Sequence, residues 1–415
     1  MVLLKRFLRK FVRVGRLTVI DVDGKRYVFG ERSGDAPEVT VALKNRRLHW
    51  KLLLHPSLYL GEAYMDGALV LAQGSIEDLL DLCIRNMMLH ARLRRNVFLR
   101  LAIHLVQRIT QWNSMARASR NVAHHYDLAH ELYESFLDSD MQYSCAYFRS
   151  SQTTLDDAQR AKRAHLAAKL LLRRNQRVLD IGSGWGGLAI DLARRAQVRV
   201  DGVTLSHEQL ALASKRAEAT GVGEDVRFHL KDYRTLQGRY DRIVSVGMFE
   251  HVGVPFYPTF FDKVRDLLAP DGVAVVHSIG SMDGPGVGNA WIRKYIFPGG
   301  YIPALSEVLP IVEASGLVVT DIEILRLHYA ETLRHWRQRF LANWDTIKSL
   351  YDERFKRMWE FYLAASEMSF RHGGLMVFQL QLARDQTAVP LTRDYIFEAE
   401  HFQPSSAAAV EACTA

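Results

Sequence analysis

The sequence predicts an α/β protein, in which a small α+β domain precedes a doubly wound sheet of seven strands. A short apolar run at residues 178–181 stops at a glycine-rich turn, and a helical pattern follows at once. This order is typical of strand, turn and helix. Strand-like and helical patterns then alternate to about residue 382, as they do around a parallel sheet. Before residue 85, short strand-like runs lie between turn residues, which indicates a separate small domain.

Length, composition and charge limit the class of protein. A chain of 415 residues suggests about two or three domains, and its apolar and charged fractions are ordinary for a globular protein. The formal net charge of +8 favours an anionic partner, either nucleic acid or anionic lipid. Cys83, Cys145 and Cys413 form no spaced set, so we expect a reducing cytoplasm and neither a disulfide framework nor a zinc site. We find neither a spanning helix nor a good secretion signal.

Residues 3–13 predict a helix with one apolar and one basic face. Such a helix can lie in a membrane interface, with apolar side chains under the lipid headgroups and cations beside the phosphates. It can equally dock on its own domain and expose its basic face to solvent. The apolar face carries Leu4, Phe7, Leu8, Phe11 and Val12, and the basic face carries Lys5, Arg6, Arg9, Lys10 and Arg13.

The rest of the small domain is predicted as strands followed by a helix. Asp23-Gly24 is a good hairpin turn, residues 61–67 are rich in turn formers, and Ser75 can cap a helix that starts after it. We therefore expect an α+β domain over residues 1–85. The strand-like runs are residues 17–22, 25–29, 39–43 and 48–52.

Residues 85–120 are basic and contain no acidic residue. One interpretation is a linker helix with a solvated face. Another is a surface for anionic lipid, since each cation near such a membrane contributes about 1 kcal/mol. Nucleic acid is less favoured, because aromatic residues for base stacking are sparse. The arginines are Arg85, Arg92, Arg94, Arg95, Arg100, Arg108, Arg117 and Arg120, interleaved with Leu93, Val97, Leu101 and Leu105.

Residues 121–403 are predicted to form the catalytic domain, after a basic linker over residues 86–120. Thr154 can cap a helix that leads into the first strand of the sheet. An aromatic-rich helical stretch, residues 332–370, precedes the last strand, and residues 404–415 are expected to be a disordered tail. The predicted strands are residues 178–181, 198–204, 226–230, 240–246, 273–278, 317–324 and 375–382.

The turn after the first strand of the sheet carries the candidate binding site. Four residues of this turn are spaced as in the first βα turn of nucleotide-binding sheets, where glycine lets the backbone approach a ligand. They are Asp180, Gly182, Gly184 and Gly186. No Gly-Lys-Ser/Thr follows, so this is not a P-loop, although a plain turn stays open on this motif alone. Glu250 and His277 follow or end the fourth and fifth strands, and should open onto the same crevice.

Two neighbouring histidines, His124 and His125, raise the question of a metal. No set of carboxylates and cysteines with ligand spacing accompanies them, so we expect no metal site.

Several dispersed stretches resemble a known family. The glycine turn, with Thr204-Leu-Ser-His-Glu-Gln, Asp232-Tyr and Val246-Gly-Met-Phe-Glu-His, is similar to class I S-adenosylmethionine methyltransferases and their Rossmann-like sheet. His125-Tyr-Asp-Leu, Met141-Gln-Tyr-Ser-Cys-Ala-Tyr-Phe, Gly247-Met-Phe-Glu-His-Val-Gly and Phe297-Pro-Gly-Gly-Tyr-Ile-Pro together resemble the cyclopropane-fatty-acyl-phospholipid synthases. The resemblance covers residues 120–400. Gly61-Glu-Ala-Tyr-Met-Asp-Gly looks like part of the extra domain of the bacterial members that act on phospholipids.

The resemblance implies two sets of site residues. A bicarbonate ion would lie beside the transferred methyl group, held by the backbone at Cys145 and by the side chains of Glu250, His277 and Tyr329. The cofactor S-adenosylmethionine would be surrounded by Tyr143, Ser144, Asp180, Gly182, Gly184, Gly186, Thr204, Gln209, Asp232, Tyr233 and Val246.

The implied activity is transfer of a methylene group to the cis double bond of an unsaturated phospholipid acyl chain. A carbocation would form, stabilised by aromatic faces such as Tyr143 and Tyr147, and the bound bicarbonate would remove a proton. The implied partner is a membrane phospholipid, reached from an anionic surface on the inner face of a bacterial membrane by a peripheral cytoplasmic enzyme. Nucleic acid is not an expected partner, and a homodimer stays open.

One departure and several alternatives stay open. Some bacterial relatives carry a cysteine where this chain has Ser366, so the product can differ from a cyclopropane. The same cation could instead give a methyl- or methylene-branched chain. A small polar substrate is disfavoured by the apolar, aromatic C-terminal stretch, and a non-catalytic lipid-binding protein is disfavoured by Glu250, His277 and Tyr329.

Overall fold

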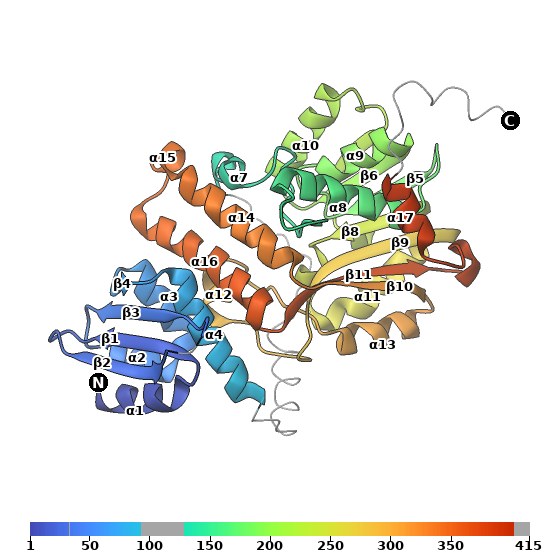
Figure 1. Cartoon of the computed structure of the whole chain (residues 1–415). Helices are drawn as coiled ribbons and strands as arrows, with labels where there is room; N and C mark the ends of the chain where they lie inside the picture. The colour runs from blue at the N-terminus through green and yellow to red at the C-terminus, as the bar shows by residue number, and fades with distance from the viewer. Residues whose placement is uncertain (33, 93–127, 402–415) are drawn as a thin grey trace.

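A seven-stranded sheet forms the centre of the larger part of the molecule (Figure 1). The computed structural model describes residues 1–32, 34–92 and 128–401. The strand order is β10-β11-β9-β8-β5-β6-β7; β5 to β9 run parallel, and β11 is antiparallel to both its neighbours. The strands are β5 (Arg177–Ile181), β6 (Arg199–Thr204), β7 (Val226–Leu230), β8 (Tyr240–Val246), β9 (Leu268–Ser281), β10 (Val318–Leu325) and β11 (Leu375–Ala383).

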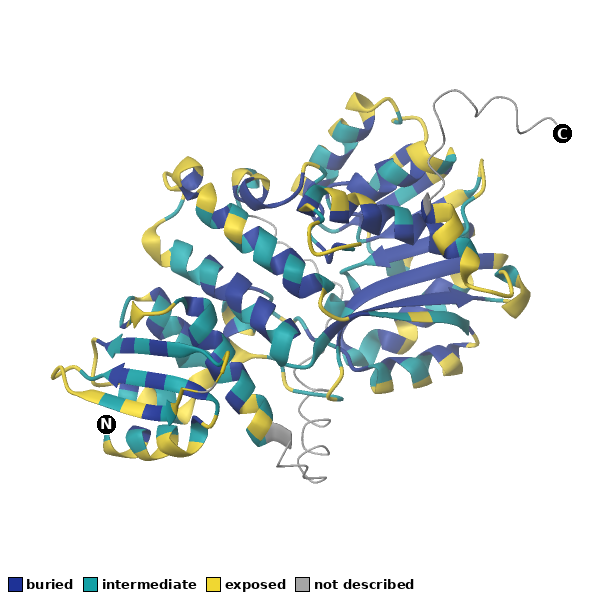
Figure 2. Cartoon of the chain, viewed as in Figure 1, coloured by how far each residue is buried: buried dark blue, intermediate teal, exposed yellow. Residues whose placement is uncertain are grey.

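The seven predicted strands and the doubly wound fold class are confirmed. The largest difference in a strand boundary is in β9, which begins at Leu268, whereas the predicted strand begins at residue 273. The inner strands β5, β8, β9 and β11 are buried along most of their length, whereas residues of the edge strands β7 and β10 are mostly half-buried or exposed (Figure 2). Burial on both faces explains why the inner strands are largely apolar.

Helices cover both faces of this sheet (Figure 1). The caps predicted at Thr154 and Ser75 are present: Thr154 Oγ1 accepts a hydrogen bond from the Asp157 N–H, and Ser75 Oγ accepts one from the Asp78 N–H. One face carries α8 (Leu155–Lys169), α9 (Gly187–Ala196), α10 (His207–Ala219) and α17 (Asp394–His401), and the other carries α11 (Tyr257–Leu267) and α13 (Leu305–Ser315). Short 3₁₀ helices are η1 (Tyr233–Thr235), η2 (Phe249–His251), η3 (Val254–Phe256) and η4 (Gln386–Ala388).

The N-terminal residues form a second, four-stranded sheet with the order β2-β1-β3-β4. The hairpin predicted around Asp23-Gly24 joins β1 to β2 in antiparallel pairing. The strands are β1 (Gly15–Ile20), β2 (Arg26–Glu31), β3 (Glu38–Leu43) and β4 (Leu69–Gln73), and the helices of this part are α1 (Val2–Phe11), α2 (Leu48–Leu54), α3 (Pro56–Met65) and α4 (Ile76–Arg92).

Helix α1 is docked on this small domain. Leu4 is only 3% exposed, and Leu8 and Phe11 pack against the same apolar cluster. Its cations Arg6, Arg9 and Lys10 stay exposed. The apolar face of α1 therefore docks on its own domain, as one of the two interpretations predicted. Binding of the basic face to a membrane stays a prediction.

Two predictions in this domain are wrong. Residues 48–52, expected as a strand, belong to α2, and most of the expected turn at residues 61–67 belongs to α3. Gly61 is not a turn residue. A Cβ at that position would lie 2.5 Å from Nε1 of Trp291, so its glycine provides the space for an indole ring.

The stretch at residues 332–370 is helical, as predicted, but it is broken into three helices. They are α14 (His328–Ala342), α15 (Trp344–Ile347) and α16 (Glu353–His372). Asp352 restarts the chain as a helix by accepting a hydrogen bond from the Phe355 N–H. Together α14 and α16 form a layer between the two sheets (Figure 1), next to α7 (His130–Phe136) and α12 (Ala290–Tyr295).

The small domain packs against α12 and α16. Trp291 of α12 is fully buried, and its Nε1 donates to the sulfur of Met65 in α3 at 3.1 Å. Ion pairs join the same surfaces, between Lys294 and Glu62 at 2.7 Å and between Arg354 and Asp66 at 2.8 Å. The four-stranded part is therefore fixed to the helical layer by both apolar and charged contacts.

Several predictions fall outside the described residues. They are the histidine pair, most of the basic stretch at residues 85–120 and the C-terminal tail. In the part of the chain that the structure describes, no helix is long and apolar enough to cross a membrane.

Candidate active site

Two pockets meet at the carboxyl ends of the parallel strands, and Tyr143, Ser144, Gly247 and His251 line both of them. The first pocket lies between the glycine turn after β5 and the ends of β6 and β8. Of the residues predicted to surround a cofactor, those that line it are Tyr143, Ser144, Asp180, Gly182, Gly184, Thr204, Gln209, Asp232, Tyr233 and Val246.

Gly186 is the exception and does not line the pocket. Its φ is +81°, and a Cβ there would lie 2.6 Å from Cζ of Phe228. This glycine therefore allows close packing of the turn against β7. Gly184, with φ of +54°, has no atom within 4 Å of the place where a Cβ would lie, so the turn leaves open space beside the pocket.

Asp180 lines the first pocket, and its carboxyl group lacks a hydrogen-bond partner at one oxygen. Its side chain is only 2% exposed, and Oδ2 has no hydrogen-bond partner. Burial raises the pKa of Asp180 to about 7, although the charge of Lys162 opposes this. The hydroxyl of Ser183, in the same turn, is also buried without a partner. Such groups are uncommon in native interiors unless a ligand completes their bonding.

Two polar pairs complete the far side of the first pocket. Thr204 Oγ1 donates to Gln209 Oε1 at 2.8 Å. Both carboxylate oxygens of Asp232 accept hydrogen bonds from the Arg234 guanidinium, at 2.8 and 2.6 Å. The orientation of these side chains is thus set before any ligand arrives.

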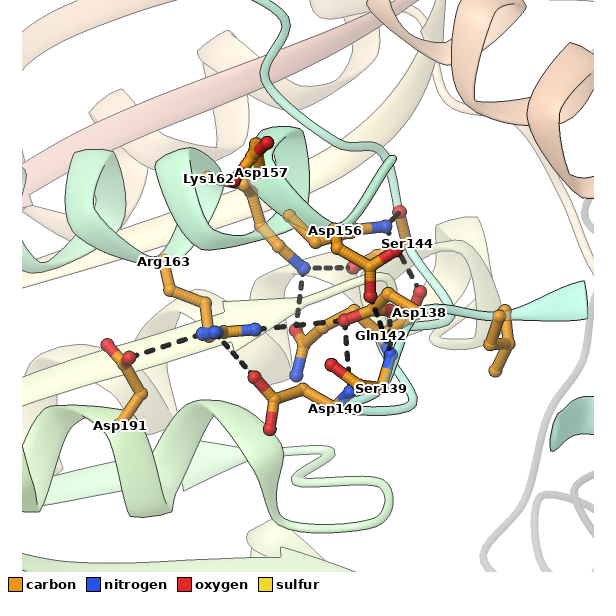
Figure 3. A network of polar contacts seen from close by, with 12 residues as sticks. Asp138, Ser139, Asp140, Gln142, Ser144, Asp156, Asp157, Lys162, Arg163 and Asp191 are labelled. Atoms are coloured by element: carbon orange, nitrogen blue, oxygen red, sulfur yellow. Dashed lines mark hydrogen bonds and ion pairs between the residues drawn. The ribbon is translucent and has the colours of Figure 1, made fainter. Parts of the chain in front are cut away.

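The segment that carries Tyr143, Ser144 and Cys145 is held by α8, whose Lys162 reaches Gln142 and Ser144 (Figure 3). Lys162 is fully buried, and its Nζ donates to Gln142 Oε1 and to Ser144 Oγ, both at 2.7 Å. Burial lowers the pKa of Lys162 to about 7, and Asp138 is the main group that opposes this. A protonated lysine can only donate, so Ser144 Oγ accepts there and keeps its own proton for another acceptor.

Arg163, the next residue of α8, fixes the start of the same segment. Its guanidinium lies 2.5 Å from Asp140, 3.3 Å from Asp191 and 3.8 Å from Asp138 (Figure 3). Sequence reasoning missed both Lys162 and Arg163. Basic residues on a helix usually belong to a solvated face, and the signal that could have found them is their place on the helix just before the glycine turn.

The second pocket is mostly apolar, and all four residues predicted to hold an anion line it: Cys145, Glu250, His277 and Tyr329. The structure therefore brings together residues from the segment before α8, from the ends of β8 and β9, and from α14. The roles assigned to them stay predictions.

Glu250, like Asp180, has a buried carboxyl oxygen without a hydrogen-bond partner. Oε1 accepts a hydrogen bond from the Ile279 N–H at 2.7 Å, whereas Oε2 is buried with no partner. Burial raises the pKa of Glu250 to about 7, against the effect of the Ile279 N–H.

His277 is held in one neutral form. Its Nδ1 lies 3.1 Å from the side-chain nitrogen of Gln379 on β11, which donates to it. Burial, and then the charge of Lys162, lower the pKa of His277 well below its usual value. A neutral ring that accepts at Nδ1 carries its proton on Nε2. Gln379 thus sets the tautomer, and sequence reasoning missed it.

Aromatic side chains surround these groups. Tyr143 OH lies 2.9 Å from Tyr362 OH, and the Tyr143 ring stacks on Trp336 with centroids 5.1 Å apart. Tyr329 packs against Phe370 at 4.9 Å. Ser366 also lines this second pocket.

The structure departs from the expectation for Tyr147. Tyr147, expected to offer an aromatic face to a cation, lines neither pocket, because its ring is stacked between His165 and His328 at 4.5 and 5.0 Å. Cys145 offers no reactive sulfur. Its thiol is buried and donates to the Ala146 carbonyl, and burial raises its pKa.

Among the described residues no group of three or more His, Cys, Asp or Glu side chains is arranged to hold a metal ion.

Comparisons with known proteins match most of the chain. A family model for mycolic acid cyclopropane synthetase matches residues 113–380. A second model, described only as a domain of unknown function, matches residues 3–92.

Individual relatives agree with the first model. The cyclopropane-fatty-acyl-phospholipid synthase of Escherichia coli (strain K12) is 40% identical over 359 residues, which cover 85% of this chain and 89% of the relative. The tuberculostearic acid methyltransferase UfaA1 of Mycobacterium tuberculosis is 42% identical over 286 residues, which cover 66% of this chain and 67% of the relative. A crystal structure of mycolic acid cyclopropane synthase CmaA1 with SAH and CTAB is 32% identical, with a TM-score of 0.60; the match covers 64% of this chain and 97% of that one.

Proposed function

The chain belongs to the mycolic acid cyclopropane synthetase family, and we propose that it forms a cyclopropane ring on the cis double bond of an unsaturated phospholipid acyl chain. Membership makes it an S-adenosylmethionine-dependent enzyme that transfers a one-carbon unit to lipid acyl chains. The phospholipid, the bicarbonate base and the ring as product are the proposal. The observation that carries it is the junction of a polar pocket with an apolar one through Tyr143, Ser144, Gly247 and His251.

The first pocket fits S-adenosylmethionine. Its unsatisfied groups, Asp180 Oδ2 and Ser183 Oγ, suit a ligand that carries an ammonium group and ribose hydroxyls. Ser144, which accepts from Lys162, keeps a proton to donate to a carboxylate. Gly182 and Gly184 would let the backbone approach the nucleoside. When bound, S-adenosylmethionine supplies a methyl group on a positively charged sulfur, which an electron-rich double bond can attack.

The second pocket fits a hydrocarbon chain. Its lining is largely aliphatic and aromatic, so it would exclude water from the double bond. Water would otherwise trap a carbocation as an alcohol. The faces of Tyr143, Tyr329 and Phe370 would stabilise a developing positive charge by cation–π contact. Alignment of the double bond with the donor in such a pocket removes much of the entropic barrier.

The polar end of the second pocket fits a bicarbonate ion. Glu250 Oε2 is buried without a partner and would accept the hydroxyl proton of the ion. His277 Nε2, protonated because Nδ1 accepts from Gln379, would donate to one of its oxygens, together with Tyr329 and the backbone at Cys145. When bound, bicarbonate supplies a base for the proton that leaves the new methyl group. Glu250 and His277 would hold that base within reach of the substrate.

We infer that the enzyme works as a peripheral protein at an anionic membrane, on the cytoplasmic side. The net charge of +8 and the exposed cations of α1 support this inference, because such charges are attracted to anionic headgroups. Nucleic acid is not a proposed partner. Whether two copies associate is a question for measurements of mass in solution.

A second candidate product is a methyl-branched acyl chain. The relative named as a tuberculostearic acid methyltransferase favours it. Ser366 also favours it, since this residue lines the second pocket, called the acyl pocket from here on, at a position where some relatives carry a cysteine. Both products start from the same cation. Loss of a proton from the new methyl group with ring closure gives the cyclopropane, whereas loss of a proton without ring closure gives a methyl- or methylene-branched chain that keeps a double bond.

The test is incubation of the purified chain with S-adenosylmethionine and dioleoylphosphatidylglycerol vesicles. We expect release of S-adenosylhomocysteine, acyl chains heavier by one CH₂ in mass spectrometry and ring protons in the NMR spectrum of the product. Signals of a branched methyl group instead would favour the second candidate. Without any transfer to unsaturated lipid, the proposed function is wrong.

A further inference from the structure

The acyl pocket has a recognisable opening. Its lining residues are buried or half-buried with two exceptions: of the described residues, only Asn289 and Arg293 line it and are exposed. Asn289 is the N-cap of α12, and Arg293 lies in the last turn of this short helix. The catalytic groups Glu250 and His277 belong to the buried part of the same pocket. A lipid would therefore enter with its acyl chain inward and with its polar part at α12.

Arg293 is the available cation at this opening. Its neighbour Lys294 is paired with Glu62 at 2.7 Å, and Asn289 uses its side-chain oxygen to accept from the N–H groups of Trp291 and Ile292. Arg293 makes no ion pair with any described residue. Its stem lies against Gly288, where a Cβ would be 3.2 Å from Arg293 Cδ. The guanidinium group is thus free for an anion, and its planar shape suits the oxygens of a phosphate.

Exposed apolar side chains flank the same opening. The segment before α12 carries Met282 and Val287, which are 53% and 58% exposed. Val287 precedes Gly288, which lines the pocket, and the Met282 N–H donates to the Gly374 carbonyl beside Leu375, another lining residue. Apolar side chains kept in water next to a pocket mouth are typical of a surface that enters a lipid layer.

We propose that Arg293 binds the phosphate of the phospholipid substrate at this mouth, while Met282 and Val287 enter the headgroup region of the bilayer. The inference rests on the proposed function and specifies which part of the substrate, beyond the acyl chain, is recognised. An acyl chain delivered by an acidic carrier protein would also meet a cation here. The two exposed apolar side chains favour the bilayer, because burial in lipid removes them from water.

The test compares two substrates with the same oleoyl chains. One is dioleoylphosphatidylglycerol, which carries a phosphate, and the other is dioleoylglycerol, which has none; both are presented in neutral detergent micelles and S-adenosylhomocysteine release is measured. For Arg293→Ala we expect the ratio of kcat/KM for the phosphate-bearing over the phosphate-free lipid to fall about fivefold, the size of one cation–headgroup contact. Arg293→Lys should recover much of the ratio. Arg174→Ala, which removes an exposed arginine that lines neither pocket, is the matched control and should not change it.

A second arm uses vesicles of dioleoylphosphatidylglycerol. Val287→Asp should weaken co-sedimentation with these vesicles, whereas it should leave the ratio measured in micelles unchanged. Melting temperature and S-adenosylhomocysteine affinity of each variant check that it folds.

The inference is overturned if Arg293→Ala leaves the ratio unchanged, or if it weakens only turnover of an acyl chain carried by a protein. These outcomes differ from failure of the proposed function, in which the unaltered enzyme transfers nothing to either lipid.

Discussion

Two buried carboxyl groups, one in each pocket, leave an oxygen without a hydrogen bond. Asp180 Oδ2 and Glu250 Oε2 are both enclosed, and burial raises the pKa of each group to about 7. An unsatisfied buried acceptor costs about 1–3 kcal/mol. A fold tolerates that cost where a ligand completes the bonding, so these two atoms mark the places where the donor and the anion are proposed to bind.

Glu250→Gln should stop product formation without weakening the binding of S-adenosylhomocysteine. The amide keeps the shape, but it cannot carry the charge that would hold bicarbonate as a base. We expect turnover to fall at least about 10²-fold, as for loss of a group that assists proton transfer. Calorimetry of S-adenosylhomocysteine binding is the control, and unchanged turnover would remove Glu250 from the mechanism.

The same group predicts a pH dependence. Only ionised Glu250 can accept the hydroxyl of bicarbonate, so kcat should rise as pH rises through about 7. The contribution of Glu250 to the free energy of unfolding changes in the opposite direction to kcat as pH rises. A carboxyl whose pKa is raised by folding stabilises the fold at low pH, and this contribution is lost as pH rises from about 4.5 towards 7. A rate that is flat between pH 6 and 8, in a protein that stays folded, would contradict this assignment.

Lys162→Met should weaken cofactor binding more than it lowers kcat. The change removes two hydrogen bonds that fix Gln142 and Ser144. Since hydrogen bonds to a charged group contribute about 1.5–3 kcal/mol, we expect the dissociation constant for S-adenosylhomocysteine to rise about tenfold or more. Arg160→Met is the matched control, because this residue of the same helix is 65% exposed and, among the described residues, pairs only with Asp157. Equal effects of the two variants would argue against a specific role for Lys162.

At this scale the sequence predicts the site unevenly. Glu250 and His277 can be placed because strand ends meet at one edge of a sheet, and Cys145 and Tyr329 come from the resemblance. Lys162 and Gln379 cannot be found in the same way. A lysine on a helix and a glutamine on a strand look like solvated residues until the packing of neighbouring elements shows that both are buried.

Individual elements also show where local patterns succeed and fail. The inner strands of the main sheet are predicted because burial on both faces makes them largely apolar. The edge strands β7 and β10, which are less buried, are predicted from the alternation of strand and helix patterns along the chain. Helix α3 is missed, because Gly61 is explained by a partner more than 200 positions away, Trp291. No local pattern contains that partner, so turn propensity gave the wrong answer.

The contact between α3 and α12 gives a prediction at this scale. Trp291→Ala should lower the free energy of unfolding by about 3–5 kcal/mol, as expected for truncation of a buried aromatic residue. Because α12 also lines the acyl pocket, KM for the lipid should rise as well. Trp50→Ala, at a tryptophan that is 58% exposed, is the control and should change stability by less than about 0.5 kcal/mol. Urea unfolding and lipid titration measure the two effects.

The whole molecule divides the work between its parts. The β5–β7 half of the main sheet carries most of the first pocket, which we propose for the cofactor. The end of β8 and the adjoining part of β9, together with α12, α14 and α16, form the second pocket, which we propose for the acyl chain. The small domain supports the wall of the acyl pocket through α3 and presents α1. The sequence predicts the small domain and the main sheet. It does not predict that the two are joined through α12, whose residues show no strong helical pattern.

Charge on α1 gives a prediction for the whole molecule. Reversal of Arg6, Arg9 and Lys10 to glutamate should weaken co-sedimentation with anionic vesicles. Co-sedimentation of the unaltered protein should also fall when salt is added. The apolar face that docks the helix is untouched, so the melting temperature should stay the same. The control is reversal of Arg173, Arg174 and Arg199 to glutamate, which changes the net charge equally. These three arginines are exposed and belong to the part of the chain that forms the main sheet. Equal loss in both variants would mean that net charge, and not α1, attracts the membrane.

The enclosed sulfur of Cys145 has a practical consequence. Burial raises the pKa of Cys83 to about 12 and raises that of Cys145 as well, so neither forms a thiolate at neutral pH. The acyl pocket has a serine hydroxyl at position 366 where a thiol occurs in some relatives. Among the described residues, then, the catalytic centre offers nothing for iodoacetamide or maleimide to alkylate, and the enzyme should keep its activity through such treatment and through storage in air.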